Sequence, residues 1–288
     1  MDPLFPSFQT IRIRNRIVDF KKPLIMGVLN ATPDSFYADS RVNSVDLAMM
    51  QADKMIQEGA SMLDIGGHST RPDAESVSLQ AEMDRVLPII EAISKTFPEI
   101  ILSVDTYRLR VAQEAFKVGA HIFNDIGGGN MDEGILDWIC ENQIPYILTH
   151  SVGAFQEVHQ HVNYSQFMQE VIANLLEKVL FLRNKGLKDL MVDPGFGFSK
   201  ALDQNYEMMA HLDQFSLLGA PILVGVSRKS MISKLLGVNS SETLNATTAL
   251  HMTALMKGAK ILRVHDVKEA DEVVQIYQKL TENGLSNL

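Results

Sequence analysis

The sequence predicts an α/β fold, a single (β/α)8 TIM barrel with a short N-terminal hairpin. Eight short apolar runs rich in β-branched residues recur along the chain, and stretches with helical periodicity lie between them. No proline- or serine-rich linker and no change of composition divides the 288 residues, of which 46% are hydrophobic. We therefore expect one domain over residues 1–288, with a doubly wound open sheet as the alternative.

The predicted elements follow one another from the N-terminus. The stretch TIRIRNRIV, residues 10–18, predicts a small hairpin that precedes the barrel and closes its bottom. The barrel strands are expected at residues 24–29, 62–66, 101–105, 121–125, 146–150, 190–194, 222–226 and 261–265. Helical periodicity fills the intervals, for instance at residues 44–58, 79–95, 164–185 and 241–257.

An internal echo supports this count of βα units. The segments EGASMLDIG, VGAHIFNDI and KGAKILRVH each place Gly-Ala at a helix end and a polar residue five positions after the glycine. The three polar residues are Asp64, Asn124 and Arg263. The repetition indicates that the three segments are equivalent units of one barrel.

Composition excludes several classes of protein. No apolar run approaches the roughly 18 residues that cross a bilayer, and the N-terminal stretch lacks the apolar core of a signal peptide. One cysteine, Cys140, excludes an internal disulfide and fits a reducing cytoplasm. A net charge of −9 argues against a general binder of nucleic acids or membrane surfaces. We expect a cytoplasmic protein whose partners are small molecules.

Polar residues gather at the predicted strand ends, where the active site of such a barrel lies. They are Asn30, Asp64, Asp105, Asn124, Asp193, Lys229, Arg263 and His265. The acceptors and amide of Asp105, Asn124 and Asp193 suit a heteroaromatic ring with several N–H donors, such as a pterin or a purine. Arg263, His265 and Asn30 suit an anion or a metal-bound anion. The sequence thus predicts a ring site beside an anion site.

Arg263 is the most informative of these residues. It interrupts a buried apolar strand, and His265 follows on the same face because side chains of a strand alternate between two faces. A guanidinium cannot lose its charge by releasing a proton, so it needs an anion when buried. The turn from Ser227 to Ser230 opens a helix and gives a second, weaker anion signal. A Schiff-base lysine of an aldolase is the other role considered for Lys229, but no neighbouring residue in the sequence marks it as buried and apolar.

Several motifs identify a resemblance to a known family. The segments MGVLNATPDSF, DIGGHSTRP, SVDT, NDIGG, DPGFGFSK, VGVSRKS and RVHDV occur in the order seen in bacterial dihydropteroate synthases, and the match spans roughly residues 23–280. The resemblance implies a TIM barrel that joins 4-aminobenzoate to (7,8-dihydropterin-6-yl)methyl diphosphate and releases diphosphate and 7,8-dihydropteroate. It also implies a Mg²⁺ requirement, a homodimer and sensitivity to sulfonamides.

The resemblance also assigns roles to individual positions. Residues that match the pterin-binding positions are Asp105, Asn124, Asp193 and Lys229, and those that match the diphosphate-binding positions are Arg263 and His265. Asn30 matches a magnesium contact. The aminobenzoate side comprises Thr70, Arg71, Pro72 and Ser230, with Phe36 on a mobile loop. The residues expected to take part in the chemical step are Asp105, Lys229, Arg263 and His265.

Two alternatives share the pterin site. A methyltetrahydrofolate-corrinoid methyltransferase needs the ring residues without the anion set of SRKS and RVH. A non-catalytic pterin-binding protein keeps both sets and makes no product. An assay for dihydropteroate distinguishes the synthase from both.

Overall fold

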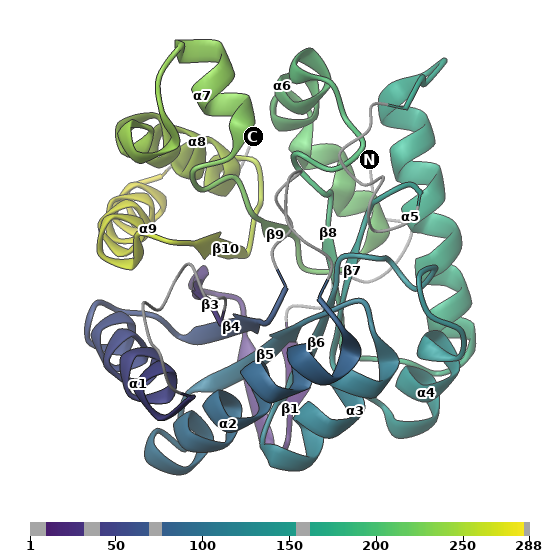
Figure 1. Cartoon of the computed structure of the whole chain (residues 1–288). Coiled ribbons are helices and arrows are strands. Elements are labelled where there is room, and N and C mark those ends of the chain that lie inside the picture. Colours follow the sequence, from purple (N-terminus) through teal and green to yellow (C-terminus); the bar gives the residue numbers. More distant parts are fainter. Residues whose placement is uncertain (1–9, 32–40, 69–76, 154–161, 285–288) are drawn as a thin grey trace.

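The computed structural model describes residues 10–31, 41–68, 77–153 and 162–284, with the side chains of residues 41–43 excepted. Eight parallel strands form one sheet in the order β8-β7-β6-β5-β4-β3-β10-β9. A parallel bridge between Val192 and Ile222 joins the two edge strands, so the sheet closes into a barrel. Helices surround the barrel (Figure 1). The predicted fold class is confirmed, and the open doubly wound sheet is excluded.

The barrel strands lie where the sequence predicts them, with small changes at their ends. They are β3 (Leu24–Asn30), β4 (Met62–Gly66), β5 (Ile101–Asp105), β6 (Ile122–Asp125), β7 (Tyr146–Thr149), β8 (Leu190–Asp193), β9 (Leu223–Val224) and β10 (Ile261–Val264). The largest change is in β9, where only two of the five expected residues form the strand and Ile222 pairs through the isolated bridge to Val192. The backbone leaves the sheet early there because it turns into the segment that carries Lys229.

Helices follow each barrel strand. They are α1 (Arg41–Gln57), α2 (Leu79–Thr96), α3 (Leu109–Val118), α4 (Ile135–Asn142), α5 (Phe167–Asn184), α6 (Leu202–Ala210), α7 (Ser230–Leu236), α8 (Leu244–Met256) and α9 (Val267–Glu282). Two short 3-10 helices, Leu212–Leu218 and Ser240–Glu242, precede β9 and α8. The expected helix 241–257 therefore starts three residues late, because Asn239 caps a 3-10 turn first. In the described residues, no helix is both long and apolar enough to cross a membrane.

The three echo segments are equivalent in the structure. Gly59, Gly119 and Gly258 all have positive φ, at 108°, 125° and 93°. Each glycine thus ends a helix in a backbone conformation that residues with a side chain avoid, and the chain then enters β4, β6 or β10. The repeated Gly-Ala is therefore a repeated helix-to-strand turn.

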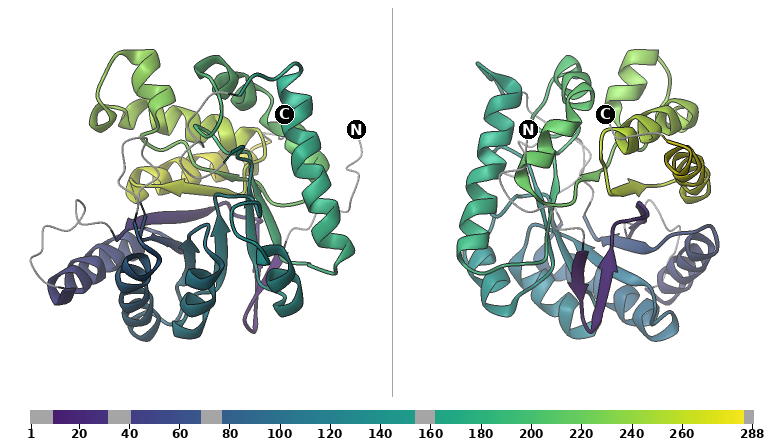
Figure 2. Two further views of the ribbon diagram at one scale, coloured as in Figure 1. Left: turned by 45° about the vertical axis from the view of Figure 1, so that its right-hand side comes forward. Right: turned by 180° about the vertical axis from the view of Figure 1, so that it is seen from behind.

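The predicted hairpin is also present and lies at the amino ends of the barrel strands (Figure 2). It consists of β1 (Thr10–Ile13) paired antiparallel with β2 (Arg16–Asp19). Its buried residues Ile11 and Ile13, with the adjacent Phe20, pack on an apolar layer to which each barrel strand contributes one residue. That layer is Met26, Met62, Ile101, Ile122, Ile147, Met191, Leu223 and Ile261. The hairpin closes the bottom of the barrel, as predicted.

Side chains of a strand alternate between the barrel interior and its outer face, so the next interior layer is formed by the residues two positions after the apolar layer. These residues are Val28, Asp64, Ser103, Asn124, Thr149, Asp193, Gly225 and Arg263, most of them polar. Gly225 confirms the geometry, because a Cβ added there would lie 3.7 Å from the Arg263 Cβ. The core therefore changes from apolar to charged within one strand repeat, toward the carboxyl ends.

Candidate active site

Arg263 is held between two carboxylates in the lumen. Its Nε donates to Asp64 Oδ2 and its Nη2 donates to Asp105 Oδ2, both at 2.6 Å. The Asp64 side chain is fully buried, while those of Asp105 and Arg263 are 12% and 20% exposed. The protein itself thus supplies the negative charge that the sequence predicts for Arg263. Among the described residues Nη1 has no hydrogen-bond partner, so one face of the guanidinium remains for an incoming anion.

Asn124 joins the same cluster. Its Nδ2 donates to Asp64 Oδ2 at 2.9 Å, so one carboxylate oxygen receives both Asn124 and Arg263. Asp64 therefore joins the three residues of the sequence echo, because Asn124 and Arg263 both donate to it. This contact orients the Asn124 amide and fixes which of its ends is left for a ligand.

Burial shifts the protonation of the neighbouring acids. It raises the pKa of Asp105 to about 7 against the opposing effect of Arg263, and the Asp64 carboxylate adds to the rise. Burial also raises the pKa of Asp193, while Lys229 opposes the change. Asp193 Oδ1 accepts the backbone N–H of Gly195 at 2.8 Å, which orients the carboxylate. Acids with raised pKa values in a cavity are typical of a functional site.

Lys229 follows β9, the strand that closes the barrel against β8 and its last residue Asp193. Its Nζ donates to the backbone oxygen of Phe196 and lies 4.3 Å from the centroid of the Phe198 ring. Burial lowers the pKa of Lys229 to about 8, and Asp193 opposes the fall. The lysine is therefore more enclosed and more aromatic in its surroundings than the sequence indicated. Phe196 and Phe198 both belong to the loop after β8, residues 194–199.

His265 and Asn30 lie at the rim of the mouth. The Nδ1 of His265 is 3.1 Å from the hydroxyl of Ser227, which links the ends of β9 and β10. Desolvation and then repulsion by Arg263 lower the pKa of His265 to about 4, although the residue reaches solvent. Asn30 ends β3 and is half-buried. The ligand-free site thus presents a neutral imidazole, and an anion beside it would favour its protonation.

The loops after β9 and β10 are tied together above the mouth. Arg228, which adopts a positive φ of 56°, donates from Nε to Asp266 at 3.0 Å and from Nη2 at 2.5 Å. Ser230 is exposed and begins α7. Of the remaining predicted site residues, Phe36, Thr70, Arg71 and Pro72 lie outside the described residues.

Sequence reasoning missed two residues of this site. Asp64 was placed at a strand end without a role, yet it is the anchor for Arg263 and Asn124. Its place in the echo beside those two residues was the available signal. Lys200 gave no signal, because it follows a loop whose path the sequence does not reveal.

Lys200 is a buried cation that organises the loop after β8. It is 4% exposed, and its Nζ donates to the backbone oxygens of Gly195 and Phe198, both at 2.9 Å. The same Nζ lies 3.0 Å from Nδ1 of His150. Burial lowers the pKa of Lys200 to about 7, while Asp193 opposes the fall. Lys200 thereby fixes Gly195, whose N–H holds the Asp193 carboxylate.

Comparison with known proteins agrees with this geometry. The family model described as pterin binding enzyme matches residues 26–265. A dihydropteroate synthase of Escherichia coli K12 is 41% identical over 263 residues, which cover 91% of this chain and 93% of that protein. A dihydropteroate synthase of Bacillus subtilis is 38% identical over 279 residues, with 96% and 95% covered.

Solved structures extend the likeness to three dimensions. Yersinia pestis dihydropteroate synthase with a sulfonamide drug complex has a TM-score of 0.88 and 37% identity, covering 95% of this chain and 99% of that one. Xanthomonas albilineans dihydropteroate synthase with 4-aminobenzoic acid has a TM-score of 0.87 and 34% identity, covering 95% and 98%. The chain therefore belongs to the family of pterin binding enzymes and, within it, to the dihydropteroate synthases.

Proposed function

We propose that this enzyme condenses (7,8-dihydropterin-6-yl)methyl diphosphate with 4-aminobenzoate to give 7,8-dihydropteroate and diphosphate. The observation that carries the proposal is the Arg263 guanidinium, clamped by Asp64 and Asp105 with one nitrogen left over, at the carboxyl ends of the barrel strands. Ring-binding acids and an anion-binding cation thus lie in one mouth. This is the arrangement that a substrate with a cationic transition state and an anionic leaving group requires.

The ring site follows from the acids and the amide. Asp193 and the Asn124 amide offer hydrogen-bonding groups to the N–H donors and acceptors of a pterin, and Asp64 and Gly195 fix their orientation. Lys229, which follows β9, lies over the Phe198 ring of the loop after β8, and together they cover the ring site. A flat ring therefore finds polar groups at its edge and an aromatic loop nearby.

The chemical step breaks the bond between the pterin methylene carbon and the diphosphate oxygen. The carbon becomes cationic and the oxygen takes the electron pair, so the ionised Asp105 stabilises the ring while Arg263 Nη1 and His265 receive the departing anion. The amine of 4-aminobenzoate then forms the new carbon–nitrogen bond, and the proton that its nitrogen loses passes to the released diphosphate or to solvent. Because the acceptor carbon is already cationic, no covalent enzyme intermediate is needed.

We propose that Mg²⁺ binds together with the diphosphate of the substrate. In the described residues no cluster of three His, Cys, Asp or Glu side chains could hold a metal ion. Mg²⁺ is commonly bound by one or two protein oxygens together with substrate phosphates, and the Asn30 side chain at the rim fits that role. Bound there, the ion would neutralise charge on the leaving diphosphate.

The second substrate and the assembly rest on the family. Ser230, exposed at the start of α7, is the described residue that we assign to the aminobenzoate side, together with Thr70, Arg71, Pro72 and Phe36.

We also propose a cytoplasmic homodimer. The exposed Leu235 and Leu236 of α7, at 58% and 51%, offer an apolar surface for a second copy. Sedimentation velocity measures the mass in solution.

Product formation is the direct test of the proposed function. The purified protein, given both substrates and Mg²⁺, is expected to release one dihydropteroate and one diphosphate per turnover. Omission of 4-aminobenzoate is the matched control. Binding of the pterin diphosphate without any product would favour the non-catalytic alternative, and methyl transfer from methyltetrahydrofolate to a corrinoid protein would favour the other.

A further inference from the structure

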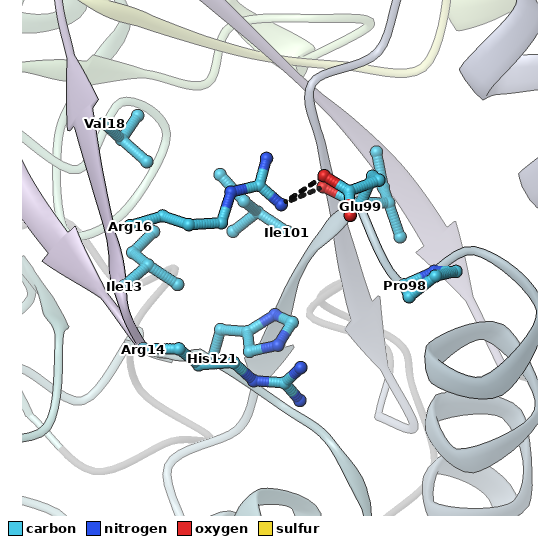
Figure 3. A pocket seen from close by; sticks show the side chains of 9 residues that line it. Ile13, Arg14, Arg16, Val18, Pro98, Glu99, Ile101 and His121 are labelled. Carbon is cyan, nitrogen blue, oxygen red and sulfur yellow. Dashed lines mark hydrogen bonds and ion pairs between the residues drawn. The ribbon is translucent and has the colours of Figure 1, made fainter.

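Two arginine–glutamate pairs lie at opposite ends of β5 and differ in burial. Figure 3 shows the pair at the amino end, where Arg16 of the hairpin contacts Glu99 at 2.8 Å. Its side chains are 53% and 85% exposed, and a pair so open to solvent contributes little to stability. The pair at the carboxyl end joins Arg108 to Glu82 at 2.7 Å, with side chains that are 18% and 0% exposed. A buried charge is unfavourable without partners, so Glu82 depends on its contacts in a way that Glu99 does not.

Glu82 holds the turn that follows β5. It lies on α2, outside the barrel, and its two carboxylate oxygens accept from different donors. Oε1 accepts the Thr106 hydroxyl at 2.6 Å, and Oε2 accepts Nη1 of Arg108 at 2.7 Å. The Thr106 hydroxyl in turn accepts the backbone N–H of Arg108 at 3.1 Å. The three residues thus form a closed ring of hydrogen bonds.

This ring fixes the end of the strand that carries Asp105. Thr106 is the next residue, and its backbone N–H donates to the backbone oxygen of Asn124 at 3.2 Å. Nη2 of Arg108 donates to the backbone oxygen of Val77, just before α2, at 2.7 Å. The turn is therefore tied both to α2 and to the end of β6. Asp105 and Asn124 are the two pterin-binding residues that this arrangement holds side by side.

Glu82 also acts on Asp105 through its charge. Burial raises the pKa of Asp105 to about 7 and Arg263 opposes the rise, while further increases come from the charges of Asp64, Glu82 and Asp125. Three of these four charged groups belong to barrel strands, namely β10, β4 and β6. Glu82 differs from them, because it reaches Asp105 from a helix outside the barrel.

We propose that Glu82 is a positioning residue for Asp105, through its contact with Thr106 and through its negative charge. This role rests on the proposed function, in which Asp105 stabilises the cationic pterin. The hydrogen bonds hold the strand end in place, and the charge raises the pH at which Asp105 takes up its proton. Arg108 balances the Glu82 charge, so that a buried carboxylate is tolerated behind the site.

A carboxyl titration tests the charge without using the reaction. The full chain is labelled with ¹³C at the aspartate Cγ, and Asp105→Asn identifies the resonance of Asp105. In Glu82→Gln, we expect Asp105 to take up its proton at a pH lower by about half a unit or more. A neighbouring negative charge is lost there, and the charge of Arg108 is no longer balanced.

The matched control is Glu99→Gln, the same substitution in the exposed pair at the amino end. Solvent and salt screen that charge, so the titration of Asp105 should stay in place. An unchanged titration in Glu82→Gln, or an equal shift in both variants, would overturn the proposal.

Kinetics test the contact with Thr106. Thr106→Val removes the hydroxyl and leaves Glu82 with Arg108 and its charge. The single-turnover rate should fall roughly three- to tenfold, while Kd for the pterin diphosphate changes by less than about twofold. In Glu82→Gln the acid limb of kcat/KM should move with the titration of Asp105. A role in stability alone would lower the urea midpoint and leave both readouts of the folded protein unchanged, which contradicts the proposal.

A double variant keeps the test decisive where Glu82→Gln does not fold. Glu82→Gln with Arg108→Met removes both charges of the buried pair, which is less unfavourable than the removal of one. The titration of Asp105 should again move to lower pH, and an unmoved titration contradicts the proposal. Failure of the proposed function gives a different result. The wild-type protein would then make no dihydropteroate, while the shift in Glu82→Gln would still support the action of Glu82 on Asp105.

Discussion

The two ends of the barrel lumen are built on the same eight strands and differ in what they bury. At the amino end every strand contributes an apolar side chain, and the hairpin seals the layer. Two residues further along, the lumen holds Asp64, Asn124, Asp193 and Arg263 in the same alternation. The comparison shows that the same strands form a rigid frame at both ends of the barrel. Residues near the amino ends of the strands contribute to stability, whereas residues near the carboxyl ends contribute to the reaction.

The charged end is held together by contacts among its own members. Asp64 is fully buried, and Arg263 and Asn124 both donate to its Oδ2. Removal of one partner from a buried ion pair leaves an uncompensated charge, which is more unfavourable than the intact pair is favourable. The amino end has no such dependence, because its side chains contribute by packing alone. Variants at the two ends should therefore fail in different ways.

The largest effect is expected from Arg263→Ala compared with Ile122→Ala. Loss of Arg263 should lower the free energy of unfolding by about 3–5 kcal/mol, because it leaves the buried Asp64 carboxylate without its cation. It should also lower turnover by at least about a hundredfold, because it removes the contact to the leaving diphosphate. Ile122→Ala at the amino end should lower the free energy of unfolding by about 2–5 kcal/mol and leave turnover of the folded fraction intact. Urea unfolding and initial rates measure both. Equal loss of turnover would erase the distinction between the ends.

A smaller effect is expected from Lys200→Met. The substitution leaves the backbone oxygens of Gly195 and Phe198 without their donor and frees the loop that orients Asp193, so pterin diphosphate should bind about tenfold more weakly. The matched control is Lys178→Met, since Lys178 donates in the same manner to Gly128 after β6, at 2.8 Å. Calorimetry should show near-normal affinity for the control. Normal affinity in both variants would exclude Lys200 as a positioning residue.

The pH dependence gives the next smaller effect. Asp105, with its pKa raised to about 7, takes up a proton as the pH falls below that value and loses the charge that stabilises the cationic ring. Lys229, with its pKa lowered to about 8, loses its proton as the pH rises above that value. kcat/KM should therefore peak between these values and fall up to about tenfold per pH unit on either side. Lys229→Arg should remove the alkaline fall, and a profile unchanged in that variant would assign it to another group.

Much of this architecture could be predicted from the sequence, because alternation and helix-to-strand turns are local. The echo placed Asp64, Asn124 and Arg263 at equivalent points, and the structure joins all three. The pairing of Arg263 with Asp105 was not predicted, since it depends on side chains that meet across the lumen from positions 158 residues apart. The enclosure of Lys229 and the role of Lys200 depend on the path of the loop after β8. Loop paths follow from tertiary contacts that a strand pattern does not contain.

Asp105→Asn tests most directly the claim that the charged end acts on the transition state. The substitution preserves size and an oxygen for Arg263, yet removes the negative charge. Single-turnover rates and calorimetry with pterin diphosphate separate the chemical step from binding. We expect the rate to fall by about a hundredfold or more while Kd changes by less than about threefold. A weaker Kd with an unchanged rate would contradict the account, because Asp105 would then bind the ground state and take no part in the chemical step.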